Sequence, residues 1–397
     1  MIPRPRPGLP LRFGAMGDRT KRTVLAFAAG AFAVGALTAP AAAAEEPRYR
    51  ADQIAELETA DVRLEAGEAR SVAHGEAAFI KARFDGVVLG ERDRIAVASP
   101  DGTESYEYGP ADVEDGVLRA LSIEGDTAEV ELRDAADGVA AAARLAAYAR
   151  GLNEEELASR PSGSAAGPES VCGRDDSADA ACYRETDPVA WDASRSVARL
   201  IIKDEYYCTA WIADDSNRIM TNNHCLDTQK EARATEVQFG YECAECGGGE
   251  VGTPLKVRGE EVLATDYTYD FTLFTVDDYD AIAHLPHLVV DPRHAENGEK
   301  VFIAGHPGGK PMRIASEDGR AVAGGQCRIE DNRAYGRGYA SDLSYYCDTE
   351  GGSSGSPVVS RTTGAVVGLH HLGGCPNSAA RMDLIYPMIA PYLQWDF

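Results

Sequence analysis

The sequence predicts a mainly β protein in which paired antiparallel barrels follow a small β-sandwich-like domain. Two observations favour this fold class. Short apolar, strand-like runs recur along most of the chain, and glycine-containing turns separate them. The 397 residues allow two or three domains, and a hydrophobic content of 44% is sufficient for packed cores.

The first element expected along the chain is a signal peptide over residues 1–44. Basic residues at 19–22 precede an apolar run at 24–37, and Ala42–Ala44 supply a small-residue cleavage site. The run is too short and too rich in Ala and Gly to favour a membrane anchor. We therefore expect a secreted, extracellular protein.

Residues 45–136 are expected to form the sandwich-like domain, with an accessory or pro-domain role. Its first part, to about Gly75, is charged and predicts a flexible or helical leader. Four strand-like runs follow, with turn signals between them: Ala77–Phe84, Arg94–Ala98, Val117–Leu121 and Ala128–Leu132. Residues 137–168 then predict an Ala-rich helix to Leu152 and a Ser/Pro/Gly linker from Ser159.

The region 169–397 predicts the paired barrels and a closing helix at Met388–Gln394. Its strand-like runs are Val197–Lys203, Tyr207–Ile212, Arg218–Thr221, Val237–Tyr241, Phe271–Val276, Val301–Ala304, Val358–Ser360 and Ala365–Leu369.

Three short motifs in this region carry the candidate chemistry: Thr221–Cys225, Tyr269–Leu273 and Gly351–Pro357. A hydroxyl is a poor nucleophile at neutral pH, so it needs a base, a group that orients the base, and donors for the developing oxyanion. We interpret Ser354 as the nucleophile, His224 as the general base and Asp270 as the orienting acid. The N–H groups of Gly352 and Ser354 are the candidate oxyanion hole.

The order His, Asp, Ser at this spacing resembles the chymotrypsin-fold (trypsin-like) serine endopeptidases. The resemblance runs from about Cys172 to the C-terminus, and the segments Thr349–Pro357 and Gly368–His371 are most similar to bacterial lysyl and glutamyl endopeptidases. It implies a secreted enzyme that hydrolyses peptide bonds through an acyl-enzyme intermediate, with no cofactor. The alternative from another class is a catalytically silent binding protein, but no triad member is missing.

The nine cysteines of an exported chain predict disulfides. The resemblance implies the pairs Cys208–Cys225, Cys327–Cys347 and Cys172–Cys375, and it leaves Cys182 to pair with Cys243 or Cys246. One thiol is left over. We expect no metal, because the Cys243/Cys246 pair lacks a second ligand pair.

Cleavage specificity is the least determined property. Asp348, Glu350 and Asp383 fall near positions where related enzymes bind Lys or Arg, and acidic residues there favour a basic substrate side chain. Thr349 and His370 instead match the pocket of glutamyl endopeptidases. We expect cleavage after Lys or Arg, with glutamyl specificity as the alternative.

The remaining expectations concern two glycines, two histidines, the partners of the chain and the role of its N-terminal region. Gly373 and Gly374 are expected to pair with the substrate backbone, His371 to be a packing or surface residue, and His306 to be a turn residue. The net charge of -25 argues against nucleic acid or anionic membranes as partners. We also expect a monomer that acts on polypeptide substrates. Ser353 stands where trypsin-like zymogens carry their activating acid, so the N-terminal region is expected to assist folding or cover the cleft.

Overall fold

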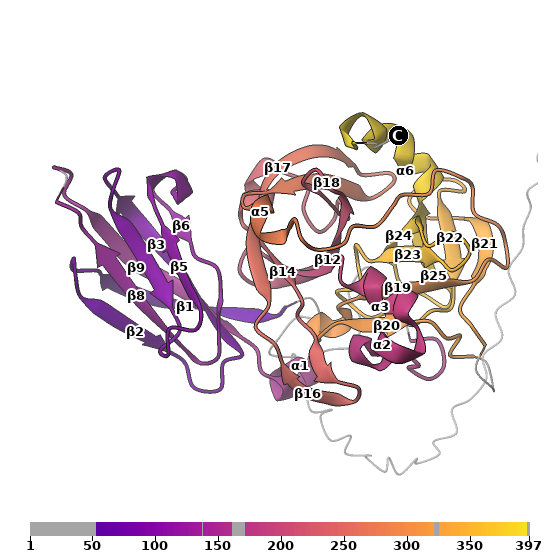
Figure 1. Ribbon diagram of the computed structural model, residues 1–397, viewed down its shortest axis with the longest axis horizontal. Coiled ribbons are helices and arrows are strands. Elements are labelled where there is room, and N and C mark those ends of the chain that lie inside the picture. Colours follow the sequence, from indigo (N-terminus) through magenta and orange to yellow (C-terminus); the bar gives the residue numbers. More distant parts are fainter. Residues whose placement is uncertain (1–52, 137, 161–170, 321–324, 395–397) are drawn as a thin grey trace, which may run out of the picture. The chain divides into compact units, whose positions relative to one another are not determined.

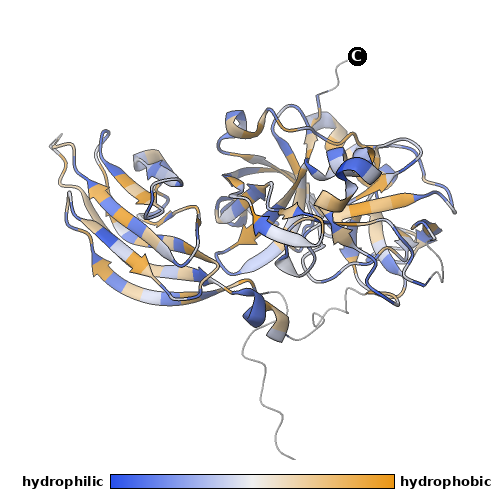
Figure 2. Ribbon diagram, turned by 60° about the horizontal axis from the view of Figure 1, so that its bottom comes forward, coloured by the Kyte–Doolittle hydropathy of each residue, from blue (hydrophilic) through white to orange (hydrophobic). Residues whose placement is uncertain are grey.

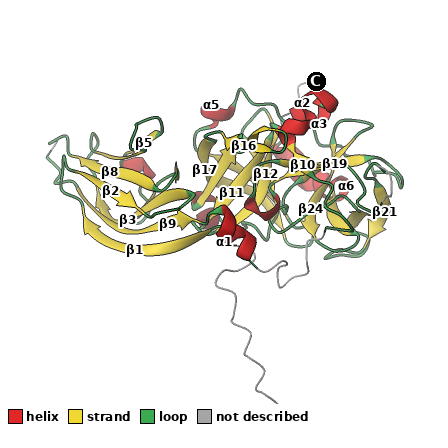
Figure 3. Cartoon of the chain, turned by 90° about the horizontal axis from the view of Figure 1, so that it is seen from below, coloured by secondary structure: helices red, strands yellow, loops and turns green. Residues whose placement is uncertain are grey.

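The computed structural model describes residues 53–136, 138–160, 171–320 and 325–394, which belong to one compact unit (Figure 1). The predicted signal peptide and most of the predicted linker lie outside the described residues. Strands are the predominant regular structure of the described chain, and its helices are short (Figure 3). The mainly β class predicted from the sequence is confirmed.

Two antiparallel sheets form the N-terminal domain. The strands are β1 (Ala55–Arg63), β2 (Ala69–Ala73), β3 (Phe79–Val88), β4 (Arg94–Ala98), β5 (Ser105–Tyr108), β6 (Leu118–Arg119), β7 (Ile123–Glu124), β8 (Thr127–Arg133) and β9 (Ala142–Gly151). One sheet has the order β1-β9-β3-β6, with β7 also paired to β3, and the other has the order β2-β8-β4-β5. Hydrophilic and hydrophobic residues alternate along these strands (Figure 2), as expected when one face covers a core.

Two predictions for this domain are wrong. The segment 55–73, expected to be a leader, contains β1 and β2, and the expected helix at 137–152 contains β9. Ala143, Leu145, Ala147 and Ala149 are buried at every second position, which is the period of a strand. Pairing with β1 and β3 therefore outweighs the helix propensity of the alanines, and the domain extends to Gly151 rather than ending at residue 136.

The first part of the C-terminal region closes into a six-stranded barrel. Its strands are β11 (Val197–Ile202), β12 (Tyr206–Asp214), β13 (Arg218–Thr221), β14 (Thr235–Phe239), β17 (Leu255–Asp266) and β18 (Phe271–Val276). The order around the barrel is β11-β12-β13-β18-β17-β14. A separate hairpin, β15 (Cys243–Glu245) with β16 (Gly248–Val251), lies between β14 and β17 in the sequence.

The second part is an eight-stranded antiparallel sheet in the order β10-β20-β19-β23-β24-β25-β22-β21. The strands are β10 (Ala178–Asp179), β19 (Val301–Gly305), β20 (Arg313–Ala315), β21 (Ile329–Ala334), β22 (Asp342–Tyr345), β23 (Pro357–Ser360), β24 (Val366–Leu372) and β25 (Asn377–Arg381). Isolated bridges between Lys300 and Arg328 and between Glu317 and Gln326 bring the edge strand β21 beside β19 and β20, so the sheet curls into a second, barrel-like unit.

Short helices fill the remaining connections. The α-helices are α1 (Glu154–Ser159), α2 (Tyr183–Thr186), α3 (Pro188–Ser194), α4 (Gln229–Arg233), α5 (Tyr279–Ile282) and α6 (Met382–Ile389), and the 3-10 turns are η1 (Pro110–Asp112), η2 (Ala180–Cys182), η3 (Pro307–Gly309) and η4 (Ala390–Tyr392). The closing helix thus begins at Met382 rather than at the expected Met388. Among the described residues, no helix combines the length and apolar character needed to cross a membrane.

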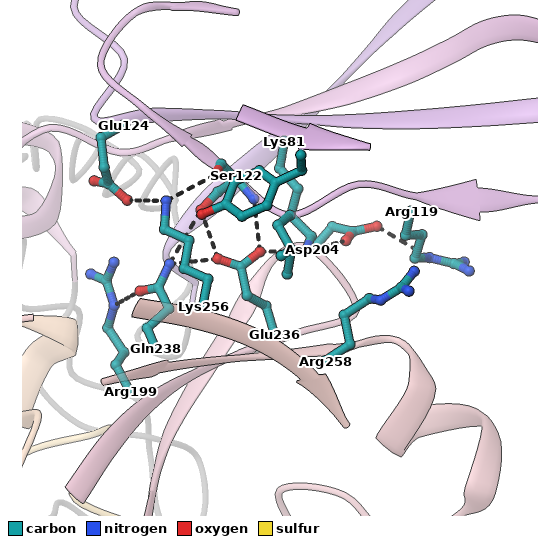
Figure 4. Close-up of polar contacts among 12 residues, drawn as sticks. Lys81, Arg119, Ser122, Glu124, Arg199, Asp204, Glu236, Gln238, Lys256 and Arg258 are labelled. Atoms are coloured by element: carbon teal, nitrogen blue, oxygen red, sulfur yellow. Dashed lines mark hydrogen bonds and ion pairs between the residues drawn. The ribbon is translucent and has the colours of Figure 1, made fainter. Parts of the chain in front are cut away.

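A buried ion cluster joins the N-terminal domain to the first barrel (Figure 4). The Lys81 ammonium on β3 lies 2.7 Å from a carboxylate oxygen of Glu236 on β14, and both side chains are almost fully buried. The Ser122 hydroxyl donates to the same carboxylate at 2.7 Å. Lys256 on β17 is fully buried and pairs with Glu104 at 2.6 Å and Glu124 at 2.8 Å, both from the N-terminal domain.

These contacts keep the buried charges ionised. Burial alone would raise the pKa of Glu236, but the charges of Lys81 and Lys256 and the hydrogen bonds from Lys81 and Ser122 lower it to about 2. A buried carboxylate left without its cation is costly, so separation of the two domains is opposed by charge as well as by apolar contact.

We predict that Lys81→Met destabilises the protein by about 3–5 kcal/mol, because it leaves the Glu236 carboxylate buried without its nearest cation. The free energy of unfolding in urea at pH 7 measures this. The wild-type contribution of Glu236 should be complete above about pH 4.5 and should be lost as the pH falls toward about 2.

Arg133→Met is the matched control for this experiment. It breaks the exposed pair of Arg133 with Glu107, which should contribute less than about 1 kcal/mol. If Lys81→Met and Arg133→Met lowered the free energy of unfolding equally, the buried charges would not be what holds the domain interface together.

Candidate active site

His224 and Asp270 meet because the strands that precede and follow them are paired. His224 follows β13 and Asp270 precedes β18, and the two strands pair up to Thr221 with Thr272. The Nδ1 atom of His224 lies 2.8 Å from Oδ2 of Asp270, and the His224 backbone N–H donates to Oδ1 at 3.0 Å. The carboxylate therefore fixes both the ring and the backbone of His224.

Asp270 is fully buried and has a left-handed backbone conformation, with φ 48°. The side-chain amide of Asn222 donates to its carbonyl oxygen at 2.7 Å and holds this conformation. Burial raises the pKa of Asp270, but hydrogen bonds from His224 and His371 outweigh burial and hold the pKa well below its ordinary value. Asp270 is therefore an anion at neutral pH.

Ser354 lies on a loop of the second barrel that contacts β12 of the first. The Thr209 N–H donates to the Ser354 carbonyl at 2.8 Å, and the Thr209 hydroxyl donates to the Gly352 carbonyl at 2.8 Å. Gly355 has φ 90°, and a Cβ atom there would lie 2.0 Å from the Thr209 carbonyl oxygen. Only glycine permits this close approach, which brings Ser354 against the strand that leads to the His224 loop.

The N–H group of Gly352 is directed by a turn of the second barrel. The Gly308 N–H donates to the Gly351 carbonyl at 2.7 Å. Because the C=O and N–H of one trans peptide point in opposite directions, this bond turns the Gly352 N–H away from Gly308. Among the described residues the Gly352 N–H makes no hydrogen bond, which is the condition an oxyanion donor must meet.

Sequence reasoning missed a second set of groups around Asp270. His371, expected to be a packing or surface residue, is buried, and its Nδ1 lies 3.0 Å from Oδ2 of Asp270. Its Nε2 lies 2.7 Å from Oδ2 of Asp342, a second buried carboxylate. The Arg337 guanidinium also lies 3.0 Å from Oδ2 of Asp270. One signal in the sequence could have revealed this set. Successive side chains of a strand point to opposite faces, so His370 and His371 on β24 face different surroundings.

The two carboxylates determine the protonation of His371. A ring that faces a carboxylate at each nitrogen donates from both, which requires the imidazolium form. Burial lowers the pKa of His371, but the hydrogen bonds to Asp270 and Asp342 and the charges of these residues raise it to about 9. His371 and Arg337 together therefore balance the charges of Asp270 and Asp342.

The acidic residues expected to bind a basic substrate side chain are engaged elsewhere. Asp348 accepts the backbone N–H groups of Cys172 at 3.0 Å and Asp176 at 2.8 Å. Glu350 pairs with Lys310 at 2.9 Å, and Asp383 accepts two hydrogen bonds from Arg381. Burial also raises the pKa of Asp348 to about 6, against the opposing hydrogen bonds from Asp176 and Cys172.

Thr349 and His370 have unused polar atoms instead. Both side chains are buried, and neither Oγ1 of Thr349 nor Nε2 of His370 has a hydrogen-bond partner in the described part of the chain. Nδ1 of His370 lies 2.7 Å from the Tyr345 hydroxyl. Burial, followed by the charges of the nearby histidines, lowers the pKa of His370 to about 3, and the Ser378 backbone opposes this only weakly. The ring is therefore neutral at pH 7.

The remaining candidate residues are Gly373, Gly374 and His306. Gly373 and Gly374 follow the end of β24, and the Gly374 N–H is already bonded to the Asn377 side chain at 3.0 Å. His306 lies at the start of η3, as expected of a turn residue, and is fully buried.

The disulfides match the pairs implied by the resemblance. The structure joins Cys208–Cys225, Cys327–Cys347, Cys172–Cys375 and Cys182–Cys246, and Cys243 is the free thiol among the described residues. The sulfur atoms of Cys208 and Cys225 lie near the His224 ring, but they are bonded to each other. A disulfide sulfur is not a thiolate, so this group does not have the chemistry of a metal site.

This fold and this site agree with a known peptidase class. Residues 208–369 match the family model of the trypsin-like peptidase domain, a range that contains His224, Asp270 and Ser354. The chymotrypsin-like fold predicted from the sequence is confirmed.

Individual proteins are also similar to the chain. It is 33% identical over 219 residues to secreted RxLR effector protein 73 of Plasmopara viticola, an alignment that covers 53% of each protein. An uncharacterized protein of Sinorhizobium fredii is 27% identical over 164 residues, or 39% of this chain and 24% of that protein. The chain thus spans about half of the first relative and about a quarter of the second.

Two solved structures have a similar fold. One is a Glu endopeptidase in complex with MPD, with 19% identity, a TM-score of 0.41, and coverage of 56% of this chain and 98% of that one. The other is an inactive form of the protease Rv3671c of M. tuberculosis H37Rv, with 18% identity, a TM-score of 0.39, and coverage of 57% and 99%.

The raised pKa of His371 predicts how stability depends on pH. Its contribution should be complete below about pH 6.5, the ordinary His pKa, and should be lost as the pH rises through about 9. In Asp342→Asn one carboxylate is removed while Asp270, Arg337 and His224 remain, so the contribution of His371 should be smaller and its loss should be complete at a lower pH than in the wild type. Unfolding free energy measured from pH 6 to pH 10 checks this.

His284→Gln is the control, because His284 is exposed and its removal should leave the profile unchanged. A wild-type profile that is flat from pH 6 to pH 10, or one that Asp342→Asn does not move, would show that His371 is not held as the imidazolium.

Proposed function

We propose that the chain is a secreted serine endopeptidase in which Ser354 is the nucleophile, His224 the general base and Asp270 the orienting acid. The observation that carries this is the hydrogen bond between His224 and the permanently ionised Asp270, with the Ser354 loop tied to the adjacent strand by Thr209. The trypsin-like match over residues 208–369 supports a proteolytic function.

In the proposed mechanism, Ser354 Oγ attacks the carbonyl carbon of the peptide bond and passes its proton to His224. His224 then gives the proton to the leaving amine, and water hydrolyses the acyl-enzyme by the same steps in reverse. The Asp270 carboxylate holds the ring with Nδ1 protonated, so that Nε2 is free to act as the base. The N–H groups of Gly352 and Ser354 stabilise the oxyanion.

Export is part of this proposal because of the disulfides. Four of them lie in the C-terminal region, and such bonds persist in oxidising compartments and are rare in reducing ones. The relative from Plasmopara viticola is itself named a secreted protein.

We predict that a fluorophosphonate labels Ser354 irreversibly in the purified protein and that Ser354→Ala is not labelled. Asp270→Asn should keep the fold but lower kcat by about 10⁴-fold, because the ring then adopts the wrong tautomer. Labelling measured by mass spectrometry and hydrolysis of a peptide substrate check the two statements. A folded wild-type protein that is neither labelled nor active would favour a non-catalytic binding protein.

For specificity, we propose that the residue preceding the cleaved bond is acidic. The basic preference expected from the sequence loses its support, because Asp348, Glu350 and Asp383 each satisfy other groups. If the Tyr345 hydroxyl donates to Nδ1 of the neutral His370 ring, Nε2 carries the proton and is left as a buried donor. The Nε2–H group of His370 and the Thr349 hydroxyl would both donate hydrogen bonds to a substrate carboxylate. The carboxylate would thereby give each of these two buried atoms a partner.

We predict that a digest of an unfolded protein mixture is cut after Glu, and that a Glu peptide is cleaved at least about 10-fold faster than its Gln counterpart. His370→Ala should abolish this discrimination, because a hydrogen bond to a charged group contributes about 1.5–3 kcal/mol. Mass spectrometry of the cut sites and kcat/KM for the peptide pair are the measurements. Cuts after Lys or Arg would reject the acidic preference and leave the endopeptidase proposal intact.

A further inference from the structure

The turn His306–Lys310 supports the peptide that carries the candidate oxyanion donor. Its Gly308 N–H bonds the Gly351 carbonyl at 2.7 Å, and its Lys310 pairs with Glu350 at 2.9 Å. The His306 carbonyl would lie only 2.8 Å from a Cβ atom at Gly352. A shift of this turn would therefore move the Gly352 N–H.

Two arginines hold the carbonyl groups of the same turn. Nη2 of Arg160 donates to the Gly308 carbonyl at 2.6 Å, and Nη1 of Arg199 donates to the Gly309 carbonyl at 3.1 Å. Gly308 and Gly309 both have left-handed conformations, with φ of 67° and 72°. Glycine adopts positive and negative φ about equally readily, so other contacts must select this conformation of the turn. Hydrogen bonds from charged donors are among the stronger ones, and here they fix the turn from two sides.

Arg160 lies beyond the last strand of the N-terminal domain, which ends at Gly151, and it is bonded back to the start of that domain. It follows helix α1, and its Nη1 donates to the Gln53 carbonyl at 2.6 Å, next to the start of β1. Its guanidinium carbon lies 5.0 Å from the centre of the Tyr207 ring. That ring would be only 2.1 Å from a Cβ atom at Gly352, so one side chain links the N-terminal domain, the turn and the wall of the candidate oxyanion hole.

The N-terminal domain is fastened firmly enough to hold Arg160 in this position. The Ile54 N–H donates to the Glu205 carbonyl at 2.7 Å, and Ile54 and Phe79 pack with Ile201 and Tyr207 of the first barrel in one buried apolar cluster. The buried ion cluster of Lys81, Glu236 and Lys256 adds a charged attachment (Figure 4).

From these contacts we infer that the N-terminal domain is a permanent part of the working enzyme, and that it holds the Gly352 N–H in place through Arg160 and the turn His306–Lys310. Arg160 is a positioning residue, because it acts on the site through Gly308 and Gly351. Position 353 holds a serine and not the acid that pairs with a freed N-terminus in trypsin-like zymogens. In this chain the docked N-terminal domain would instead order the peptide that carries the Gly352 N–H. The inference rests on the proposed peptidase function.

The test compares Arg160→Gln with Arg70→Gln. Arg70 lies in the N-terminal domain, but it is exposed, and its ion pair among the described residues is with Glu68. The concentration of active sites is titrated with a fluorophosphonate, and kcat, KM and the inhibition constant of a peptide aldehyde, whose adduct occupies the oxyanion hole, are measured per active site. Arg160→Gln should lower kcat by about 10- to 100-fold and raise the inhibition constant of the aldehyde by the same factor. KM should stay within about 3-fold of the wild-type value. Arg70→Gln should match wild type.

Arg160→Lys serves as the second variant, because a single ammonium group cannot reach both carbonyl groups as the guanidinium fork does. It should give a kcat between those of wild type and Arg160→Gln, and it remains informative if Arg160→Gln does not fold. Wild-type kcat per titrated site in either Arg160 variant would overturn the inference, even if thermal stability fell. A wild-type protein that is not labelled at all would instead overturn the proposed function.

Discussion

The junction between the two barrels at Thr209 is the constraint on which the candidate site depends. The proposed base and orienting acid come from the first barrel, whereas the proposed nucleophile comes from the second. Thr209 joins them through one backbone bond to Ser354 and one side-chain bond to Gly352, and its hydroxyl also accepts the His306 N–H at 3.1 Å. A single β-strand residue thus sets the distance between the loops, since each bond tolerates only a few tenths of an ångström.

Buried carboxylates are paired with cations both at the candidate site and at the domain interface. Asp270 and Asp342 face His371 and Arg337, and Glu236 faces Lys81 and Lys256. In each place at least one ion pair joins segments that are far apart in the sequence, such as Asp270 with His371 and Lys81 with Glu236, so these charges are satisfied only when the segments have docked. An ion pair of this kind adds little net stability over apolar packing, but it penalises partly assembled forms. The correct docking of domains and barrels is thereby favoured over alternatives.

The sequence predicted the elements whose local pattern agrees with their tertiary role. Strands such as Phe271–Val276 and Arg218–Thr221 were predicted at their observed bounds, because an apolar run between turn residues needs no further context. The Ala-rich strand β9 was not, since its burial period arises from pairing with strands far away in the sequence. His371 was missed for a related reason: its two carboxylate partners lie 101 and 29 residues away. Proximity to Ser354 in sequence suggested Asp348 as a pocket residue, but its partners at residues 172 and 176 come from the other end of the domain.

Under the proposed peptidase function, the Cys172–Cys375 bond would limit the damage caused by self-cleavage. It spans 203 residues and encloses the segments that carry His224, Asp270 and Ser354. A single backbone cut anywhere inside that loop leaves two pieces that are still covalently tethered. Self-inflicted nicks in surface turns would therefore not release fragments, and a clipped molecule could keep its architecture for as long as its surroundings stay oxidising.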